Sequence, residues 1–188
     1  MIILYNPQST PSNKKPLPMS LLAVASTLEG EHEYEIVDGN LLADPAAHII
    51  ALGQQQKLTA VAFTVMPGPQ LNRAVPDAKR IKAALPDVPI VWGGYFASQH
   101  DDVILKETYV DFCVHSQGEQ TFLELVRVLK HGGDFSNIAG ISYRESAITH
   151  PPSAIVHNPH RPLIPLDQLP DWPYHKLPME RYFHKHYL

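Results

Sequence analysis

The feature that most constrains this fold is a regular alternation between two hydrophobic patterns. From Ile2 to Gly133, five short apolar runs typical of buried strands alternate with segments whose apolar residues recur at helical spacing. The strand-like runs lie at residues 2–5, 34–37, 60–65, 89–98 and 111–114, and the helical segments begin near residues 18, 44, 70, 103 and 119. Parallel strands joined by right-handed helical crossovers build a doubly wound sheet. We therefore predict an α/β, Rossmann-like (flavodoxin-like) fold with a five-stranded parallel sheet in the order 2-1-3-4-5.

A different pattern follows Gly133. Residues 138–144 and 154–157 alternate like two short strands around a turn near residues 146–152, which predicts a small β-hairpin. Prolines then recur to the end of the chain, which is typical of an extended arm that packs on another surface. We therefore predict three parts, at residues 1–135, 136–157 and 158–188. The chain ends without a helix cap or stop signal, so we expect it to be a piece cut before its next domain.

Composition excludes several classes of protein. Charged residues make up 18% and hydrophobic residues 44%, as in globular proteins, and the net charge of −4 provides no electrostatic footprint for nucleic acid. No apolar run is long enough for a membrane span, and the apolar N-terminus is too short for a signal peptide. The single cysteine, Cys113, excludes an internal disulfide and an all-cysteine metal site. We expect a cytoplasmic protein.

Small and rigid residues follow four of the predicted strands. These loops are the proline-rich segment 6–16, Met66-Pro67-Gly68-Pro69, Gly93-Gly94 and Gln117-Gly118-Glu119. The carboxyl ends of parallel strands meet at one edge of the sheet, so the four loops predict a binding crevice there. The glycine pair removes Cβ atoms where a ligand approaches the backbone. The alternative is a tight turn that only needs glycines for positive φ.

These motifs, taken in order, resemble the cobalamin-binding N-terminal domain of class B radical S-adenosylmethionine enzymes. That family contains anaerobic magnesium-protoporphyrin IX monomethyl ester cyclase and B12-dependent methyltransferases. The segments that carry the resemblance are Asn6-Pro7, Pro16-Leu17, residues 34–38, residues 91–98, residues 111–114 with Gly118-Glu119, residues 138–144 and residues 166–170.

The resemblance implies that this chain binds cobalamin. Gly93-Gly94 would let the nucleotide tail pass close to the strand ends, Thr64 would offer a hydroxyl, and the amides at Gly118-Glu119 would offer helix N-terminal donors. The corrin would lie over the loops after the first, third and fourth strands. We expect a bulky side chain at either glycine to block binding and leave the fold largely intact. The full set of expected cofactor-binding residues is Asn6, Pro7, Thr64, Val65, Met66, Gly93, Gly94, Tyr95, Phe96, Gly118 and Glu119.

Departures from the family pattern refine this expectation. The family's Gly-Glu-Gly-Glu is Ser116-Gln117-Gly118-Glu119 in this chain, and the Asp-x-His-x-x-Gly motif whose histidine ligates cobalt in other B12 domains is missing. The cofactor is therefore expected base-off and His-off. One cysteine cannot supply the family's Cys-x-x-x-Cys-x-x-Cys site, so S-adenosylmethionine and the [4Fe-4S] cluster would belong to a C-terminal radical SAM domain, the expected partner in cis. The arm after Asn158 resembles the linker before that domain, and we expect no catalytic residue in this chain.

The histidines and the cysteine carry weaker signals. His100 and His115 follow strands and could reach the crevice, but an ordinary hydrogen-bonded loop histidine is the simpler interpretation. His184 and His186 have metal-ligand spacing without partner ligands nearby, so we predict no metal ligands. Cys113 lies within an apolar strand and is expected to be buried.

Two other functions fit the same fold. A flavodoxin-like module would bind flavin mononucleotide through Ser9, Thr10 and Ser12, although a proline-rich loop without glycine is poorly suited to cradle a phosphate. A ligand-free docking module would use only the proline-rich arm to pack on a partner. A receiver domain is excluded, because the first strand ends without an acidic pair and the third ends without an aspartate.

Overall fold

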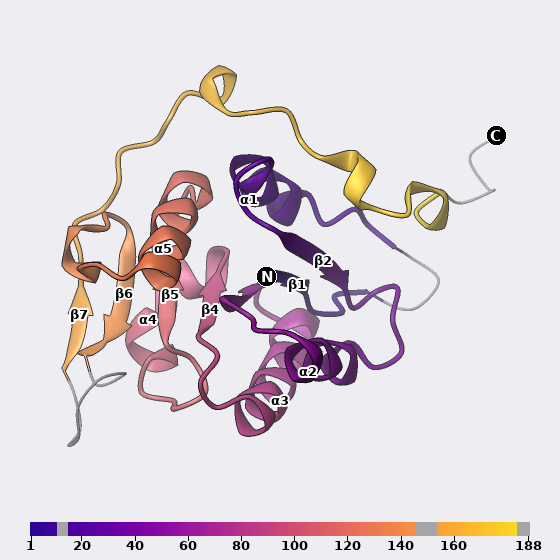
Figure 1. Cartoon of the computed structure of the whole chain (residues 1–188), viewed down its shortest axis with the longest axis horizontal. Coiled ribbons are helices and arrows are strands. Elements are labelled where there is room, and N and C mark those ends of the chain that lie inside the picture. Colours follow the sequence, from indigo (N-terminus) through magenta and orange to yellow (C-terminus); the bar gives the residue numbers. More distant parts are fainter. Residues whose placement is uncertain (11–14, 146–153, 184–188) are drawn as a thin grey trace.

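A computed structural model describes residues 1–10, 15–145 and 154–183 of the chain. Within these residues the strands form one seven-stranded sheet in the order β2-β1-β3-β4-β5-β6-β7 (Figure 1). The first five strands run parallel, which confirms the predicted order 2-1-3-4-5. The strand bounds are β1 Ile2–Asn6, β2 Tyr34–Asp38, β3 Ala60–Thr64, β4 Ile90–Gly93, β5 Phe112–Val114, β6 Ile141–Arg144 and β7 Ile155–His157.

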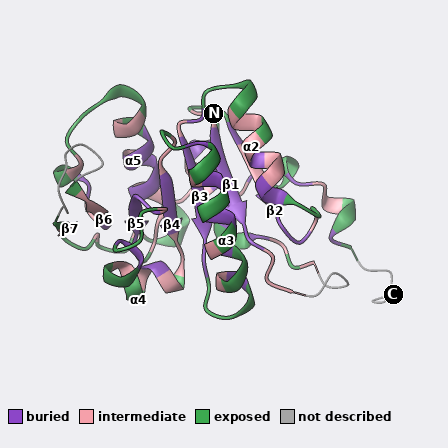
Figure 2. Ribbon diagram, turned by 90° about the horizontal axis from the view of Figure 1, so that it is seen from below, coloured by how far each residue is buried: buried purple, intermediate pink, exposed green. Residues whose placement is uncertain are grey.

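In the described part of the chain, five α-helices cover the two faces of the sheet. Their bounds are α1 Met19–Leu28, α2 Pro45–Gln55, α3 Pro69–Ala84, α4 Tyr95–Ile104 and α5 Glu119–His131. One buried cluster joins the sheet to α2, α3 and α4, and a second joins it to α1 and α5. We call these the back face and the front face, respectively. Buried residues concentrate in the strands and exposed residues on the outer sides of the helices (Figure 2).

The same strands supply side chains of different size to the two faces. Successive residues of a strand point to opposite faces. Tyr5, Phe63 and Trp92 belong to the back cluster and are at most 2% exposed. On the front face, β3 presents Ala62 and then Thr64, and β4 presents Val91 and then Gly93, with Thr64 paired to Gly93 in register. The front face is therefore left with small residues at the carboxyl ends of the central strands.

Local sequence explains where several elements begin and end. Asp44 caps α2, because its side chain accepts a hydrogen bond of 2.9 Å from the amide of Ala47, and Pro45 occupies the first helical position. Gly30 follows the end of α1 with a φ of +77°, a conformation that glycine adopts without strain. These boundaries agree with the sequence-based expectation.

Helix α4 differs from the expectation. The sequence pattern predicted an extended stretch to Ser98, a polar connection at residues 99–102 and then a helix from Val103. The helical segment instead spans Tyr95–Ile104, with a kink at His100, whose φ of −136° and ψ of +28° are not helical. Gly94 has a φ of +87°, which turns the chain directly from β4 into the helix. Ala97 and Ile104 are the buried residues of α4, Phe96 packs against the core with part of its surface exposed, and Val103 is 61% exposed. The helical period could not be followed through the polar residues 99–102, because the helix is kinked among them at His100.

The predicted hairpin is present and continues the main sheet. β6 pairs antiparallel with β5, and β7 pairs antiparallel with β6. The expected turn near residues 146–152 lies outside the described residues. The sequence pattern predicted the hairpin but not its pairing with β5, because strand pairing depends on hydrogen bonds between segments that are distant in the sequence.

The segment after Asn158 forms an extended arm that passes α5 and then α1 (Figure 1). Its far end packs on the molecule, because Leu177 and Tyr182 form a buried cluster with Leu22 of α1, and Trp172 packs against it. The arm contains short 3-10 turns at Leu166–Gln168, Tyr174–Lys176 and Met179–Arg181. None of the described helices has the length and apolar character needed to cross a membrane.

Candidate functional site

A cavity of about 150 Å³ lies on the front face, between the sheet and helices α1 and α5. Ala62, Thr64, Val91, Gly93 and Val114 form its floor. Its walls come from α1 and from the loop that leads into α5, namely Ser20, Leu21, Ala23, Val24, Ser116, Gln117, Gly118, Glu119 and Phe122. The lining is mainly apolar, with hydroxyl, amide and carboxylate groups at its rim, as in a site built for a largely apolar ligand.

A wider hollow of about 370 Å³ adjoins this cavity at the carboxyl edge of the sheet. The two spaces share Ser20, Thr64 and Gly94 as lining residues. The hollow is otherwise lined by the loops after β1 and β3, the segment before α1 and Tyr95. Met19, Met66 and Tyr95 expose about half of their surface around it. The arrangement is a deep apolar slot that opens into a broad, partly apolar platform.

Gly93 keeps the floor of the cavity open. Its φ is not positive, and a Cβ atom added there would lie 3.8 Å from its nearest neighbour, the carbonyl oxygen of Phe63. This is an ordinary van der Waals distance, so neither the backbone nor the surrounding protein requires glycine at this position. The missing side chain instead leaves space in the cavity.

Gly94 has a different role. Its φ of +87° disfavours other residues, and a Cβ atom there would lie 3.1 Å from both the amide nitrogen and the carbonyl oxygen of Val65. Those atoms are fixed by hydrogen bonds, from the Val65 amide to the Gly93 carbonyl and from the Phe96 amide to the Val65 carbonyl. The expectation that a bulky residue at either glycine would leave the fold intact is therefore wrong for Gly94.

A hydroxyl pair lies where the cavity meets the hollow. Ser20 Oγ and Thr64 Oγ1 are 3.0 Å apart, and both residues line both spaces. One hydrogen bond between two hydroxyls leaves one proton and several lone pairs for a ligand. Thr64 was predicted from the sequence and Ser20 was not. The helical period of α1 could have placed Ser20 near the helix start, but only the packing of α1 shows which side faces the cavity.

Asn6 holds loops together. Its side chain donates to Asp38 Oδ1 at 2.9 Å and accepts from Gln70 Nε2 at 2.7 Å. Gln70 Nε2 also donates to the carbonyl of Pro7, and Gln70 Oε1 accepts from the amide of Met66. Asn6 borders the hollow with 5% of its surface exposed, so its amide is committed to positioning the loops after β1, β2 and β3.

The structure brings most of the predicted site residues together. Thr64, Gly93, Gly94, Gly118 and Glu119 line the cavity, and Asn6, Met66 and Tyr95 join Thr64 and Gly94 around the hollow. Pro7, Val65 and Phe96 line neither space. Val65 is completely buried in the back cluster, and Phe96 packs against that cluster. Their part in the site is to fix the backbone of the loops.

Glu119 has an unusual environment. It lines the cavity at the start of α5, and its Oε2 is shielded from solvent without a hydrogen-bond partner among the described residues. A buried carboxylate oxygen without a partner is costly unless a ligand donates to it. Glu119 is thus a candidate acceptor for a hydroxyl group.

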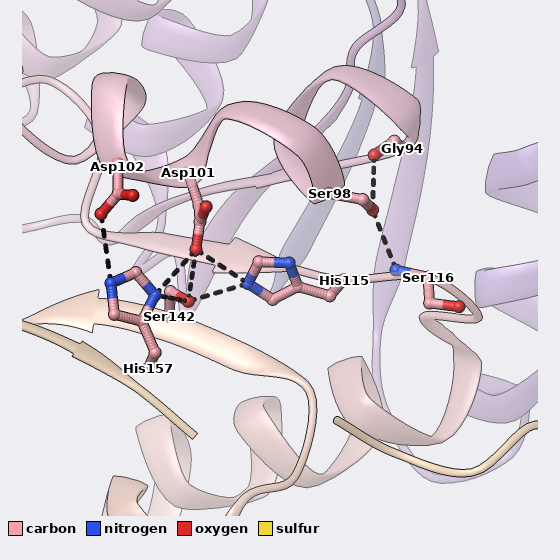
Figure 3. Close-up of polar contacts among 8 residues, drawn as sticks. All are labelled: Gly94, Ser98, Asp101, Asp102, His115, Ser116, Ser142 and His157. Carbon is pink, nitrogen blue, oxygen red and sulfur yellow. Dashed lines mark hydrogen bonds and ion pairs between the residues drawn. The ribbon is translucent and has the colours of Figure 1, made fainter. Parts of the chain in front are cut away.

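Ser98 joins the two loops that flank the cavity. Its hydroxyl donates to the carbonyl of Gly94 at 3.0 Å and accepts from the amide of Ser116 at 2.9 Å (Figure 3). Ser116 has a φ of +56°, which is rare for a residue other than glycine. The hydrogen bond from Ser116 to Ser98 helps to hold this conformation, so the β4–α4 and β5–α5 loops are fixed relative to each other.

His115 precedes Ser116 in the sequence and lines neither the cavity nor the hollow. Its Nε2 is 2.8 Å from Ser142 Oγ and 3.3 Å from Asp101 Oδ2, and His157 Nδ1 contacts the same two groups (Figure 3). Burial lowers the pKa of His115. It is thus the hydrogen-bonded histidine that the simpler interpretation predicted.

The other histidine and the cysteine that the sequence singled out make packing contacts. The ring of His100 packs against Phe96, with 4.7 Å between ring centroids. Cys113 is fully buried, and burial raises the pKa of its thiol. Among residues 1–10, 15–145 and 154–183, no group of three His, Cys, Asp or Glu side chains is arranged to hold a metal ion. His184 and His186 lie outside the described residues.

Comparison with known proteins identifies the family. The B12 binding domain model matches residues 12–126. An uncharacterized methyltransferase of Pyrococcus horikoshii is 31% identical over 170 residues, which cover 88% of this chain and 35% of that protein. The anaerobic magnesium-protoporphyrin IX monomethyl ester cyclase of Synechocystis is 35% identical over 65 residues, or 34% of this chain and 13% of that enzyme.

Solved structures share the fold. The radical S-adenosylmethionine methyltransferase TsrM of Kitasatospora setae, solved with cobalamin and a [4Fe-4S] cluster, aligns with a TM-score of 0.67 at 20% identity over 84% of this chain and 30% of TsrM. The cobalamin-dependent radical enzyme OxsB, solved with aqua-cobalamin, gives a TM-score of 0.67 at 20% identity over 86% of this chain and 22% of OxsB.

The family match and the fold agree with the resemblance found in the sequence. The chain spans about a third of the Pyrococcus relative, at 35% of its length, so the comparisons bear on one domain of larger proteins. This chain belongs to the B12 binding domain family and is related to the cobalamin-binding domains of B12-dependent radical SAM enzymes.

Proposed function

We propose that this domain holds cobalamin with the nucleotide tail in the front-face cavity and the corrin over the adjoining hollow. The observation that carries the proposal is the open floor at Gly93, where the protein has room for a side chain and none is present. A flat aromatic base requires such a slot between a sheet and two helices. Eight of the eleven residues expected from the sequence line the cavity or the hollow and remain the proposed contacts, with Ser20 and Gln70 added. Pro7, Val65 and Phe96 line neither space and are not proposed to touch the cofactor.

The polar groups at the cavity rim suit the rest of the tail. A ribose has hydroxyl donors, and Glu119 Oε2 is a shielded acceptor without a partner among the described residues. The Ser20–Thr64 hydroxyl pair retains a proton for an acceptor atom of the base. The amide groups at the start of α5 favour a phosphate near Gly118. The residues present therefore fit a nucleotide tail.

The proposed binding mode is base-off and His-off. The base cannot occupy the cavity and coordinate cobalt at once, and none of the described histidines lines the cavity or the hollow. His115, which follows β5, is engaged with Ser142 and Asp101. Bound cobalamin supplies a cobalt centre for methyl transfer or cyclisation. We place that chemistry on a radical SAM domain in cis, which would carry S-adenosylmethionine and the [4Fe-4S] cluster.

The same proposal divides the chain into three parts, at residues 1–135, 136–157 and 158–188. It also includes a cytoplasmic location. The matched relatives are much longer than this chain, which supports a piece of a multidomain enzyme. The arm beyond Asn158 would then connect this domain to the catalytic one.

Flavin mononucleotide is less well suited to the site. In the loop after β1, the amides of Ser9 and Thr10 and the Thr10 hydroxyl already bond to Asn40 Oδ1. A phosphate cradle needs free backbone amides. Flavin is therefore the appropriate control ligand.

The test is a titration of the purified chain with hydroxocobalamin, followed by gel filtration at the corrin absorption bands. We expect stoichiometric co-elution at roughly ten micromolar protein. Flavin mononucleotide should elute separately with its fluorescence unquenched. After reduction to cobalt(II), the electron paramagnetic resonance spectrum should show no splitting from an axial nitrogen. No co-elution would overturn the proposed function, and nitrogen splitting would overturn the binding mode.

A further inference from the structure

Gln117 forms part of the cavity wall and reaches out to the arm. Its Oε1 accepts a hydrogen bond of 2.6 Å from the Ile164 amide, and its Nε2 donates one of 3.0 Å to the Ile164 carbonyl. One primary amide thus pairs with both polar groups of one arm residue, 47 positions away in the sequence. Gln117 is one of the two positions, with Ser116, where the chain departs from the family's Gly-Glu-Gly-Glu pattern. A glutamate could not donate to the carbonyl in its ionised form.

The proline spacing of the arm prepares this contact. Pro159, Pro162 and Pro165 recur every third residue, which is the period of the polyproline II helix. Arg161 and Ile164 share that period and therefore one side of the segment, which faces α5. Arg161 donates to Thr121 Oγ1 at 2.9 Å and pairs with Glu124, while Ile164 pairs with Gln117. A stiff segment loses little conformational entropy when it docks.

The arm is also fixed at the opposite side of the cavity. Tyr182 OH donates to Asp38 Oδ2 at 2.8 Å, and the same carboxylate accepts from Asn6. Leu177 and Tyr182 pack on Leu22, which lies between the cavity-lining residues Leu21 and Ala23 of α1. The arm therefore contacts both walls of the cavity, α5 at one end and α1 at the other.

We propose that Gln117 is a positioning residue that latches the arm to the cavity wall, so that arm docking and cobalamin binding favour each other. This inference rests on the proposed function. The latch consists of Gln117 with arm residues 159–165. It acts by holding the β5–α5 loop in the shape that receives the tail, and no atom of the arm needs to touch the cofactor. Coupling of this kind is reciprocal, since the docked arm raises affinity by the factor by which the cofactor stabilises the docked arm.

The first test compares two glutamine variants. Gln117→Ala removes both hydrogen bonds to Ile164, and we expect cobalamin to bind roughly five- to tenfold more weakly, as for the loss of two neutral hydrogen bonds. Gln55→Ala is the matched control, because Gln55 is an exposed residue of α2 that lines neither the cavity nor the hollow. Its affinity should stay within about twofold of the wild type. Isothermal titration would measure both.

The second test approaches the latch from the arm. Ile164→Pro removes the amide that donates to Gln117 and leaves the cavity lining unchanged. Leu163→Pro is the matched control, because Leu163 is 72% exposed and its amide has no partner among the described residues. We expect Ile164→Pro to weaken cobalamin binding as Gln117→Ala does and Leu163→Pro to leave it unchanged. Both substitutions lie far from the core, so these variants keep the test valid if Gln117→Ala fails to fold.

The third readout is one that a merely structural residue would not change. In the wild type, saturating cobalamin should slow hydrogen exchange of the Ile164 amide by about the factor that Gln117→Ala loses in affinity. In Gln117→Ala the cofactor should leave that exchange rate unchanged. The wild type could bind cobalamin while the affinity loss in Gln117→Ala and the slowing of Ile164 exchange by cobalamin both stay below about twofold. That result would overturn the latch and leave the proposed function standing. A wild type that does not bind would overturn both.

Discussion

The two faces of the sheet are built from the same strands but end differently at the carboxyl edge. On the back face, Tyr5, Phe63 and Trp92 form a continuous aromatic row, with ring centroids 4.9 and 6.0 Å apart along it. On the front face, the neighbouring residues Thr64 and Gly93 leave a cavity of about 150 Å³. At the carboxyl edge, side chains fill the back face, whereas the front face contains a cavity.

This difference separates stability from binding within a few residues. The buried aromatic row removes a large apolar area from water and stabilises the sheet. The small front-face residues add little to the core and provide the space for a ligand. Trp92 and Gly93 are neighbours in β4, yet they belong to opposite faces because successive strand residues alternate. Substitutions at the two positions should therefore have opposite consequences.

The largest effect is expected for Trp92→Ala. Trp92 is 1% exposed and packs against Phe63 and Tyr109. Its removal should lower the free energy of unfolding by about 3–5 kcal/mol, as for other buried tryptophans. Urea denaturation would measure it. If Trp92→Ala destabilises the protein less than a substitution at Gly93 does, the back face does not carry more of the stability than the front face.

A smaller loss of stability is expected for Gly94→Ala than for Trp92→Ala. Gly94→Ala places a Cβ atom 3.1 Å from the Val65 backbone at a positive φ, so it should destabilise the protein by about 1–3 kcal/mol. Gly93→Ala is the matched control and should change stability by less than about 0.5 kcal/mol. Equal losses of stability at the two positions would mean that Gly93 is also required by the fold. The measurement is the midpoint of thermal or urea unfolding for each variant.

The smallest effect concerns pH. Burial lowers the pKa of His115, so the unfolded chain binds more protons than the folded one below its ordinary pKa of about 6.5. The contribution of His115 to stability is present above that pH and is lost as the pH falls through the folded pKa. His115→Gln should therefore show a flatter dependence of unfolding free energy on pH below about 6.5 than the wild type. An identical slope would contradict a buried, neutral His115. Asp101, His157 and His160 face the same ring, so the comparison needs constant ionic strength.

The fold was largely predictable from the sequence, because each element has a local signal. Apolar runs separated by helical periods specified the parallel sheet, and Asp44-Pro45 and Gly30 specified helix ends. The first part of helix α4 was not predicted, because a kink at His100 interrupts the helical period within its polar residues. The place of the hairpin in the main sheet was not predictable either, since strand pairing depends on backbone hydrogen bonds between distant segments.

The site was predictable in its location but not in its details. Loops after parallel strands must meet at one edge, so Thr64, Gly93 and Glu119 were expected there. Adjacent letters in the sequence do not show that Gly94 serves the backbone while Gly93 serves the cavity, because the difference depends on φ and on nearby atoms. The contributions of Ser20, Gln70 and Gln117 depend on contacts across 44 or more positions, which no local pattern encodes.

We propose that the open floor at Gly93 is where this domain receives cobalamin. The most direct test is a hydroxocobalamin titration of Gly93→Val, with urea denaturation of the same sample. Valine suits a strand and would occupy the cavity, so we expect affinity to fall by a hundredfold or more, about 3 kcal/mol, while the unfolding free energy stays within about 1 kcal/mol of the wild type or rises. A Gly93→Val domain that binds cobalamin as tightly as the wild type would contradict binding of the cofactor at this floor.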